Sequence, residues 1–323
     1  MKKVIGIDIG GTKCAAVLGE LNAQGPRILS KRTVQTRQFQ SPQELLHQLV
    51  ELICEQAEGD LSQFYGIGIS CGGPLDSRRG VIQSPPHLPG WDNIPVVDFF
   101  SERLGMPAYL QNDANACAVA EWKYGAGRGC RDMVFLTFGT GLGAGLILNG
   151  GLYNGCCDMA GEIGHIRMEP LGPAGYGKLG SLEGFCSGDG IALFTQMKLW
   201  EQSQRGAHHR LQDMEVTAQN VFELARQGDS FCLSICQSVG EYFGRGLSVI
   251  IDMLNPELIV AGSIFTRHYD ILYPAAKAVV EREALLRSQS CCKIVPAALG
   301  ESLGDVAALS LAMGTDEGSW SNV

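Results

Sequence analysis

The sequence predicts an α/β fold built from two similar lobes, and three observations lead to this prediction. An apolar strand opens each half of the chain, at residues 4–9 and 133–138. Each strand runs into a glycine-rich turn, Asp8-Ile-Gly-Gly-Thr-Lys13 in the first half and Gly139-Thr-Gly-Leu-Gly143 in the second. Segments with helical spacing follow, and strands that alternate with helices are typical of α/β folds.

Local patterns predict the other elements in order. Ser41-Pro42-Gln43-Glu44 is a helix start, with Ser as N-cap and Pro in the first turn, and apolar spacing extends this helix to about residue 57. The proline-rich segment 85–91 cannot be helical and is predicted to be a surface loop. Further strands are expected at 14–18, 27–33, 65–70, 106–110, 143–148, 257–260 and 293–296, and helices at 115–124, from about 190 to 254 and at 304–312. The glycine-laden segment 155–190 is expected to be irregular and the polar tail 314–323 to be frayed.

Composition restricts the class of protein. Apolar residues make up 45% of the 323 residues and charged residues 18%, which is typical of a soluble globular protein. The net charge of −9 works against nonspecific binding to nucleic acid. No apolar run is long enough for a membrane span, and the N-terminus does not resemble a signal peptide. We therefore expect a cytoplasmic protein whose twelve cysteines are reduced thiols.

The two glycine turns are candidate phosphate sites. In the first turn, the backbone N–H groups of Gly10, Gly11 and Thr12 can converge on an anion, and Lys13 can add positive charge. Asp8 is placed to hold Mg²⁺, directly or through water. A tight hairpin with an exposed Asp is the alternative. The second turn repeats the design with Gly139, Thr140, Gly141 and Gly143, and neither turn fits the P-loop or the Rossmann pattern.

A carboxylate between the two turns is the candidate general base. Asp113 follows a predicted strand and is flanked by Asn112 and Asn115, so it can accept the proton of a sugar hydroxyl while the amides hold neighbouring hydroxyls. The alternative is that Asp113 caps the following helix, and both roles can coexist. Glu162, His165 and Glu183 are groups that suit polyol recognition, although a single His in a glycine-rich loop is more often structural.

These motifs together resemble the ROK family of sugar kinases and sugar-responsive repressors, and the resemblance covers nearly the whole chain. It rests on both glycine turns, on Asn112-Asp-Ala-Asn115, on Gly161-Glu-Ile-Gly-His165, on Asn255-Pro-Glu-Leu-Ile-Val-Ala-Gly262 and on Gly304-Asp-Val-Ala-Ala308. It implies the actin-like ATPase fold, with ATP and Mg²⁺ as cofactors in a cleft between the lobes. It also implies Asp113 as the catalytic base, sugar contacts from Gly73, Asn112, Glu162, His165 and Glu183, and adenine near Ala261 and Gly262.

The chain departs from the family at one place. Many members bind zinc with the signature His and a Cys-x-Cys-Gly-x-x-Gly-Cys-x-Glu stretch, but here the three thiol positions hold Ala174, Tyr176 and Ser181. Because a structural zinc site needs about four good ligands, we predict no zinc site. Hydrogen bonds from Tyr176 and Ser181 are the hypothesis for what braces the loop instead.

The resemblance favours a kinase over the alternatives. Family repressors carry a DNA-binding segment ahead of the first turn, for which we expect no room here, since that turn begins at Asp8. We predict one lobe from residues 1–112 and the C-terminal helix at about 300–313, and a second lobe from 113–299. The predicted activity is transfer of phosphate from ATP to a hexose such as glucose or N-acetylmannosamine, by a homodimer or homotetramer. A non-catalytic sugar sensor and a generic ATPase remain the alternatives.

Overall fold

A computed structural model describes residues 2–22 and 25–313, so the predicted frayed tail at 314–323 lies outside the described residues. The chain divides into two compact units. Unit 1 comprises residues 1–131, 145–160 and the segment from 298 onward, and unit 2 comprises 132–144 and 161–297. The predicted lobe boundary after Asn112 falls inside unit 1, and it stays a prediction.

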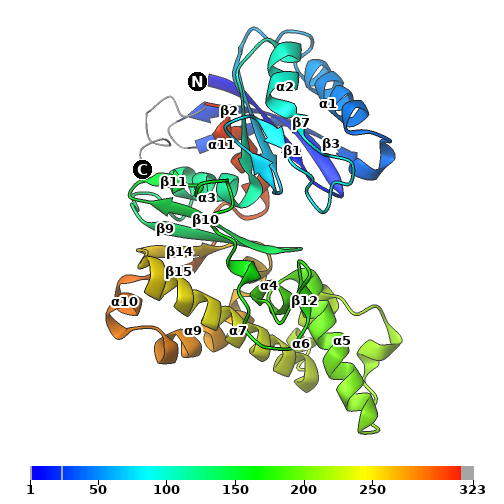
Figure 1. Cartoon of the computed structure of the whole chain (residues 1–323), viewed down its shortest axis with the longest axis vertical. Coiled ribbons are helices and arrows are strands. Elements are labelled where there is room, and N and C mark those ends of the chain that lie inside the picture. Colours follow the sequence, from blue (N-terminus) through cyan, green and yellow to red (C-terminus); the bar gives the residue numbers. More distant parts are fainter. Residues whose placement is uncertain (1, 23–24, 314–323) are drawn as a thin grey trace. The chain divides into compact units, whose positions relative to one another are not determined.

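Unit 1 is built on a five-stranded mixed sheet with the strand order β3-β2-β1-β4-β8. Strands β1, β2 and β3 form an antiparallel meander, whereas β4 and β8 lie parallel to β1. Figure 1 shows this sheet with its helices. The bounds are β1 Lys2–Ile9, β2 Lys13–Asn22, β3 Gly25–Gln35, α1 Pro42–Gln56, β4 Phe64–Cys71, α2 Val96–Leu104, β8 Ala108–Asn112, α3 Asp113–Tyr124 and α11 Leu303–Leu311.

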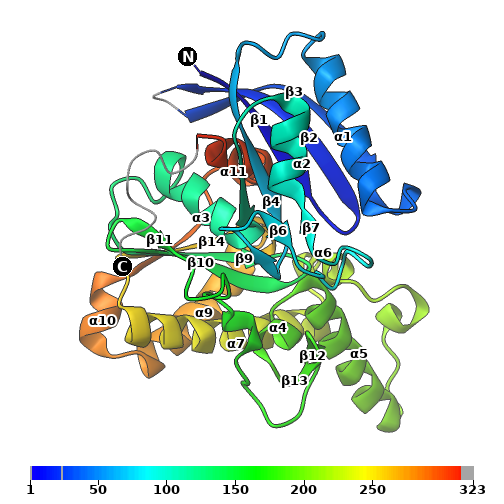
Figure 2. The same cartoon turned by 45° about the horizontal axis from the view of Figure 1, so that its top comes forward.

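Helices cover both faces of the unit 1 sheet. Helices α1 and α2 lie along one face (Figure 2), where the alternating side chains of β1, with Ile5 and Ile7 among them, enter the main apolar core. Val4 of β1 points to the opposite face and packs with Leu309 of α11. Helix α3 packs against α11 on this second side. Unit 1 also contains a small sheet of β5 Leu75–Asp76, β6 Val81–Ile82 and β7 Ile94–Pro95. Strand β11 Gly151–Tyr153 lies in unit 1 as well, but it belongs to a different sheet.

Unit 2 contains three parallel strands, β9, β14 and β15, which belong to a sheet with the order β11-β10-β9-β14-β15. The long helices α7 and α9 pack against each other in the same unit. The bounds are β9 Met133–Phe138, β10 Leu142–Leu148, β12 Ala174–Gly175, β13 Lys178–Leu179, α4 Leu182–Phe185, α5 Gly188–Gln204, α6 Ala218–Arg226, α7 Ser230–Leu254, β14 Leu258–Ala261, α8 Ile264–Arg267, α9 Tyr269–Glu283, α10 Leu286–Cys291 and β15 Lys293–Pro296. In unit 1, short 3₁₀ helices lie at Thr36–Gln38 and Gly300–Ser302, and in unit 2 at Ile163–His165 and Arg210–Asp213.

The α/β fold class is confirmed, and most predicted elements are present. Ser41 caps α1 as expected, its side chain accepting a hydrogen bond from the Glu44 N–H at 3.2 Å. Helices α2, α8, α9 and α10 were not predicted, and the segment expected to be irregular contains β12, β13 and α4. Among the described residues, no helix combines the length and the apolar character needed to cross a membrane.

Candidate functional site

The strand register of unit 1 brings the first glycine turn and the candidate base to one edge of the sheet. Ile9 at the end of β1 pairs with Cys71 of β4, which pairs with Asn112 at the end of β8. The glycine turn follows Ile9, and Asp113 follows Asn112. Ligand sites of parallel sheets lie at the carboxyl ends of the strands, and both motifs are at that edge.

The first glycine turn is held in shape from one side. The hydroxyl of Thr36 donates a hydrogen bond to the Gly10 carbonyl oxygen at 2.6 Å, and the Thr36 N–H donates to the Thr12 oxygen at 2.9 Å. Gly10, Gly11 and Thr12 follow the end of β1, and Thr12 is exposed. The turn is therefore braced through its carbonyl groups, as a preformed anion site requires.

Asp8 lies on β1 among other acidic groups. Burial raises its pKa to about 7, with further upward contributions from the charges of Asp113 and Asp305, while Lys31 and Lys13 act in the opposite direction. Lys31 forms an ion pair with Asp305 in which Nζ lies 2.6 Å from Oδ1. An excess of carboxylates that lack full compensation is the environment that a divalent cation stabilises.

Asp113 is the first residue of α3, but it is not the N-cap residue of that helix. The N-cap is Asn112, whose Oδ1 accepts hydrogen bonds from the Ala114 N–H at 2.9 Å and the Asn115 N–H at 3.4 Å. Solvent reaches the Asp113 side chain, yet the surrounding protein reduces its hydration and raises its pKa. Asp113 Oδ1 also accepts from the Ala114 N–H at 2.8 Å, so Asp113 shares in the capping that Asn112 performs, and its other carboxylate oxygen remains for chemistry.

The side chains of the two asparagines beside Asp113 differ in how far the protein already occupies them. Asn115 is buried, and its side-chain amide donates to Gln111 Oε1 at 3.1 Å and to Asn154 Oδ1 at 3.0 Å. It is therefore structural, and the expectation that it holds a sugar hydroxyl was wrong. Gly73 lies against the side-chain amide of Asn112, so these two predicted sugar-contacting residues are neighbours.

The second glycine turn and the predicted adenosine segment occupy the corresponding edge in unit 2. Leu136 of β9 pairs with Ala261 of β14, and the Gly262 N–H donates a hydrogen bond to the Leu136 oxygen at 2.9 Å. Gly139 begins the turn just after β9, and its carbonyl oxygen accepts from the Gly188 N–H at the start of α5 at 2.7 Å. Thr140, Gly141 and Gly143 thus lie at the same strand edge as Ala261 and Gly262.

The predicted sugar-binding side chains gather in unit 2. Glu162 and His165 lie in or beside the Ile163–His165 turn and are exposed. Gly164 of this turn packs against Glu183. One Glu183 oxygen accepts a hydrogen bond from the Leu142 N–H at 2.9 Å, so this carboxylate also braces the second glycine turn. No local sequence pattern indicates this hydrogen bond between Glu183 and Leu142.

Hydrogen bonds hold the loop in which Ala174, Tyr176 and Ser181 occupy the family's three thiol positions. Ser181 is buried, and its hydroxyl accepts from the Gly184 N–H at 3.2 Å and donates to the Gly175 oxygen at 3.4 Å. Tyr176 is exposed and meets the His165 ring edge-on, with ring centroids 6.2 Å apart. Lys178 instead holds the loop, because its Nζ donates to the His165 carbonyl oxygen at 2.7 Å.

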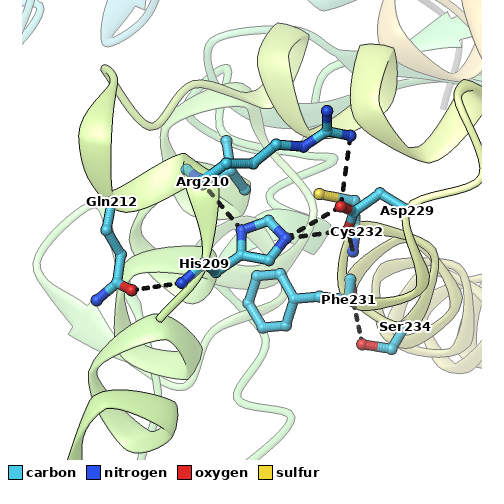
Figure 3. Close-up of polar contacts among 8 residues, drawn as sticks. His209, Arg210, Gln212, Asp229, Phe231, Cys232 and Ser234 are labelled. Atoms are coloured by element: carbon cyan, nitrogen blue, oxygen red, sulfur yellow. Dashed lines mark hydrogen bonds and ion pairs between the residues drawn. The ribbon is translucent and has the colours of Figure 1, made fainter. Parts of the chain in front are cut away.

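A separate cluster in unit 2 brings together donor atoms that metals can use, but its contacts explain it without a metal. Potential ligand atoms of His209, Asp229 and Cys232 lie within 4.8 Å of one another (Figure 3). Asp229 caps α7 by accepting from the Cys232 N–H at 3.0 Å, and His209 Nε2 lies 3.1 Å from both Asp229 oxygens. His209 Nδ1 accepts from the Leu211 N–H at 3.2 Å, so a neutral ring carries its proton on Nε2 and donates it to Asp229. The Arg210 guanidinium, 3.4 Å from Asp229, further disfavours a cation.

Structure and sequence comparisons agree on one family. The model of the ROK family matches residues 4–315. The glucokinase of Thermotoga maritima is 31% identical over 96% of this chain and 96% of its own length, and the Escherichia coli repressor Mlc is 30% identical over 70% of this chain and 55% of its own length. A Streptomyces griseus ROK family glucokinase, solved with glucose and AMPPNP, is 28% identical, covers 96% of this chain and 99% of that one, and superposes with a TM-score of 0.76. The fold is the two-lobed actin-like α/β fold of these sugar kinases.

Proposed function

The chain belongs to the ROK family, and we propose that it is an ATP-dependent hexose kinase. Glucokinase relatives that match over almost the whole chain make it a sugar kinase. Within that class, we propose transfer of the γ-phosphoryl group of ATP to a sugar hydroxyl. The proposed acceptor is the 6-hydroxyl of glucose, N-acetylmannosamine or a related aldohexose.

The observation that carries the proposal is the position of Asp113, which keeps one carboxylate oxygen available while the other accepts from the Ala114 N–H at 2.8 Å. Asn112 performs the main capping of α3, so Asp113 presents a solvent-accessible carboxylate at the sheet edge that also carries the first glycine turn. Phosphoryl transfer asks a protein to position the two reactants and to stabilise charge, with a carboxylate orienting the attacking hydroxyl. Asp113 would accept the hydroxyl proton as the oxygen attacks phosphorus.

Asp8 fits the role of a Mg²⁺ ligand. Its raised pKa reflects burial and the neighbouring charges of Asp113 and Asp305, and a bound cation would relieve this repulsion. When bound, Mg²⁺ neutralises charge on the phosphate oxygens. Gly10, Gly11, Thr12 and Lys13 would hold the phosphates on the same side.

The second set of proposed binding residues belongs mainly to unit 2. Glu162, His165 and Glu183 would bind sugar hydroxyls, together with Gly73 and Asn112 of unit 1. Gly139, Thr140, Gly141 and Gly143 would hold phosphate, and adenine would lie near Ala261 and Gly262. Support comes from the shared strand edge of the second glycine turn and Ala261, and from the Streptomyces griseus relative, which was solved with glucose and AMPPNP.

A non-catalytic sugar sensor is the second candidate, because the repressor Mlc is also similar to this chain. The two candidates differ in one measurable property. A kinase releases ADP only when its sugar is present, whereas a sensor binds sugar without consuming ATP.

The test is coupled detection of ADP release across a panel of aldohexoses, with wild type and the Asp113→Asn variant. We expect one or more hexoses to support turnover and the variant to lose a factor of about 10² to 10⁴ in kcat while it still binds the sugar. Calorimetry with the sugar that supports turnover is the control for binding. ADP release without sugar dependence, or near-normal turnover of the variant, would exclude the proposal.

A further inference from the structure

A loop in unit 1 that is tied by hydrogen bonds contacts the first glycine turn. The loop spans residues 83–93 and is closed by hydrogen bonds from the Ser84 N–H to the Trp91 oxygen at 2.8 Å and from the Ser84 hydroxyl to Asp92 at 2.8 Å. Leu88 and Trp91 anchor it, since their side chains are only 2% and 3% exposed. The loop is therefore anchored at Leu88 and Trp91, next to His87.

His87 is the residue that this loop places against the glycine turn. A Cβ atom on Gly11 would lie 2.5 Å from the His87 carbonyl oxygen and 2.6 Å from the His87 Cβ. Only glycine at position 11 permits this approach without movement of the loop backbone. The base of the His87 side chain is thus in contact with the proposed phosphate site.

The imidazole itself is exposed and lies within electrostatic reach of Asp113. His87 is exposed to solvent, and within residues 2–22 and 25–313 no hydrogen bond to its ring is found. Burial raises the pKa of Asp113, and hydrogen bonding with Ala114 and the charge of His87 act in the opposite direction. His87 therefore adjoins the glycine turn, and its charge acts on the candidate base.

We propose that His87 is a catalytic residue that donates a hydrogen bond from its imidazole N–H to the transferring phosphoryl group, an assignment that rests on the proposed function. The phosphoryl group would move from the first glycine turn, which His87 contacts, to the hydroxyl at Asp113. The bond between the sugar oxygen and phosphorus forms as the bond from phosphorus to the ADP oxygen breaks, and the hydroxyl proton goes to Asp113. His87 neither gains nor loses a proton in this step. Its N–H stabilises the charge on the phosphoryl oxygens.

Steady-state kinetics of His87→Ala tests the proposal. Removal of one donor to a developing anion is expected to lower kcat and kcat/KM together by about 100-fold, with the KM values for ATP and sugar within about twofold of wild type. Ser84→Ala is the matched control, because it loosens the same loop but keeps the imidazole, and its kcat is expected to stay within about threefold. A kcat of His87→Ala within threefold of wild type overturns the proposal. Absence of sugar-dependent ADP release in wild type overturns the kinase assignment and this proposal with it.

A binding experiment on wild type gives a readout without turnover and covers the case in which His87→Ala does not fold. The chain has six histidines, so ¹H–¹³C correlation spectra of their rings are simple, and His87→Asn assigns the His87 signal. We expect AMPPNP with sugar to move this signal further than ADP with sugar does, because only AMPPNP carries the third phosphate. Equal movement with both nucleotides would overturn the contact.

Discussion

Acidification from pH 8 to pH 6 is expected to weaken metal binding at Asp8 by about tenfold. The Asp8 pKa is raised to about 7 by burial and by the charges of Asp113 and Asp305. A carboxyl group with this pKa is about nine-tenths ionised at pH 8 and about one-tenth ionised at pH 6. Because a cation binds the carboxylate and must displace any proton, its affinity follows the ionised fraction and falls as the pH drops through 7.

Two variants of the charges near Asp8 test the direction in which its pKa, and with it the midpoint of the pH dependence, is shifted. Lys31→Met removes a positive charge that lowers the Asp8 pKa and leaves Asp305 without its ion-pair partner, so the midpoint of the pH dependence is expected to rise. Asp305→Asn removes a negative charge that raises the Asp8 pKa, so the midpoint is expected to fall.

Isothermal titration with Mg²⁺ or Mn²⁺ at pH 6, 7 and 8 and constant ionic strength measures the effect. Asp8→Asn is the control, and it is expected to bind weakly at every pH. A wild-type affinity that changes by less than twofold between pH 6 and pH 8 would refute the reasoning. A shift of the midpoint in the same direction by Lys31→Met and Asp305→Asn would refute it as well, because electrostatics requires opposite shifts.

Three substitutions and one composition measurement test residues that support the fold around the site. Glu121 is fully buried and accepts hydrogen bonds from the Ala126 N–H at 2.8 Å and the Leu299 N–H at 2.9 Å, so Glu121→Gln turns an amide donor toward one of them and is expected to cost about 1–3 kcal/mol in urea denaturation. Ser181→Ala removes the cap of α4 and is expected to cost about 1 kcal/mol, whereas Tyr176→Phe is expected to have an effect below about 0.5 kcal/mol. Elemental analysis is expected to find no zinc in the purified protein, and one zinc per chain would contradict the hydrogen-bonded loop.

The elements that the sequence predicted are those with a strong local signal. Strand β1 contains an apolar run and is followed by glycine, and α1 begins with a capping pattern, so neither needs tertiary information. Helix α9 contains Pro274, which local rules interpret as a helix end, although packing against α7 maintains the helix. Helix α2 has a readable signal that was overlooked, since Val96, Phe100 and Leu104 share one face and Gly105 follows in the left-handed conformation.

The site was predictable where a motif is contiguous and not where distant segments meet. Asp8, Asn112 and Asp113 lie in short recognisable runs, and the strand register brings them to one edge. The pair of Lys31 and Asp305 joins residues 274 positions apart, so no local pattern could indicate it. His87 belongs to a segment that the prolines correctly predicted as a loop, but only the structure brings it against Gly11.

The loop at 172–184 shows why the glycines of the family pattern can remain when the thiols are absent. Gly180 has a φ of +65°, and a Cβ there would lie 2.0 Å from the Glu169 carbonyl oxygen. The Met168 N–H donates to the Gly180 oxygen at 2.7 Å, and the Gly180 N–H donates to the Pro173 oxygen at 3.0 Å. The backbone path therefore depends on glycine and on these hydrogen bonds, and a metal would add a further tie to a shape that already exists. On this reasoning the position of Glu183 depends on the glycines and on Ser181, so loss of the Ser181 hydroxyl is expected to impair sugar binding more than chelators do.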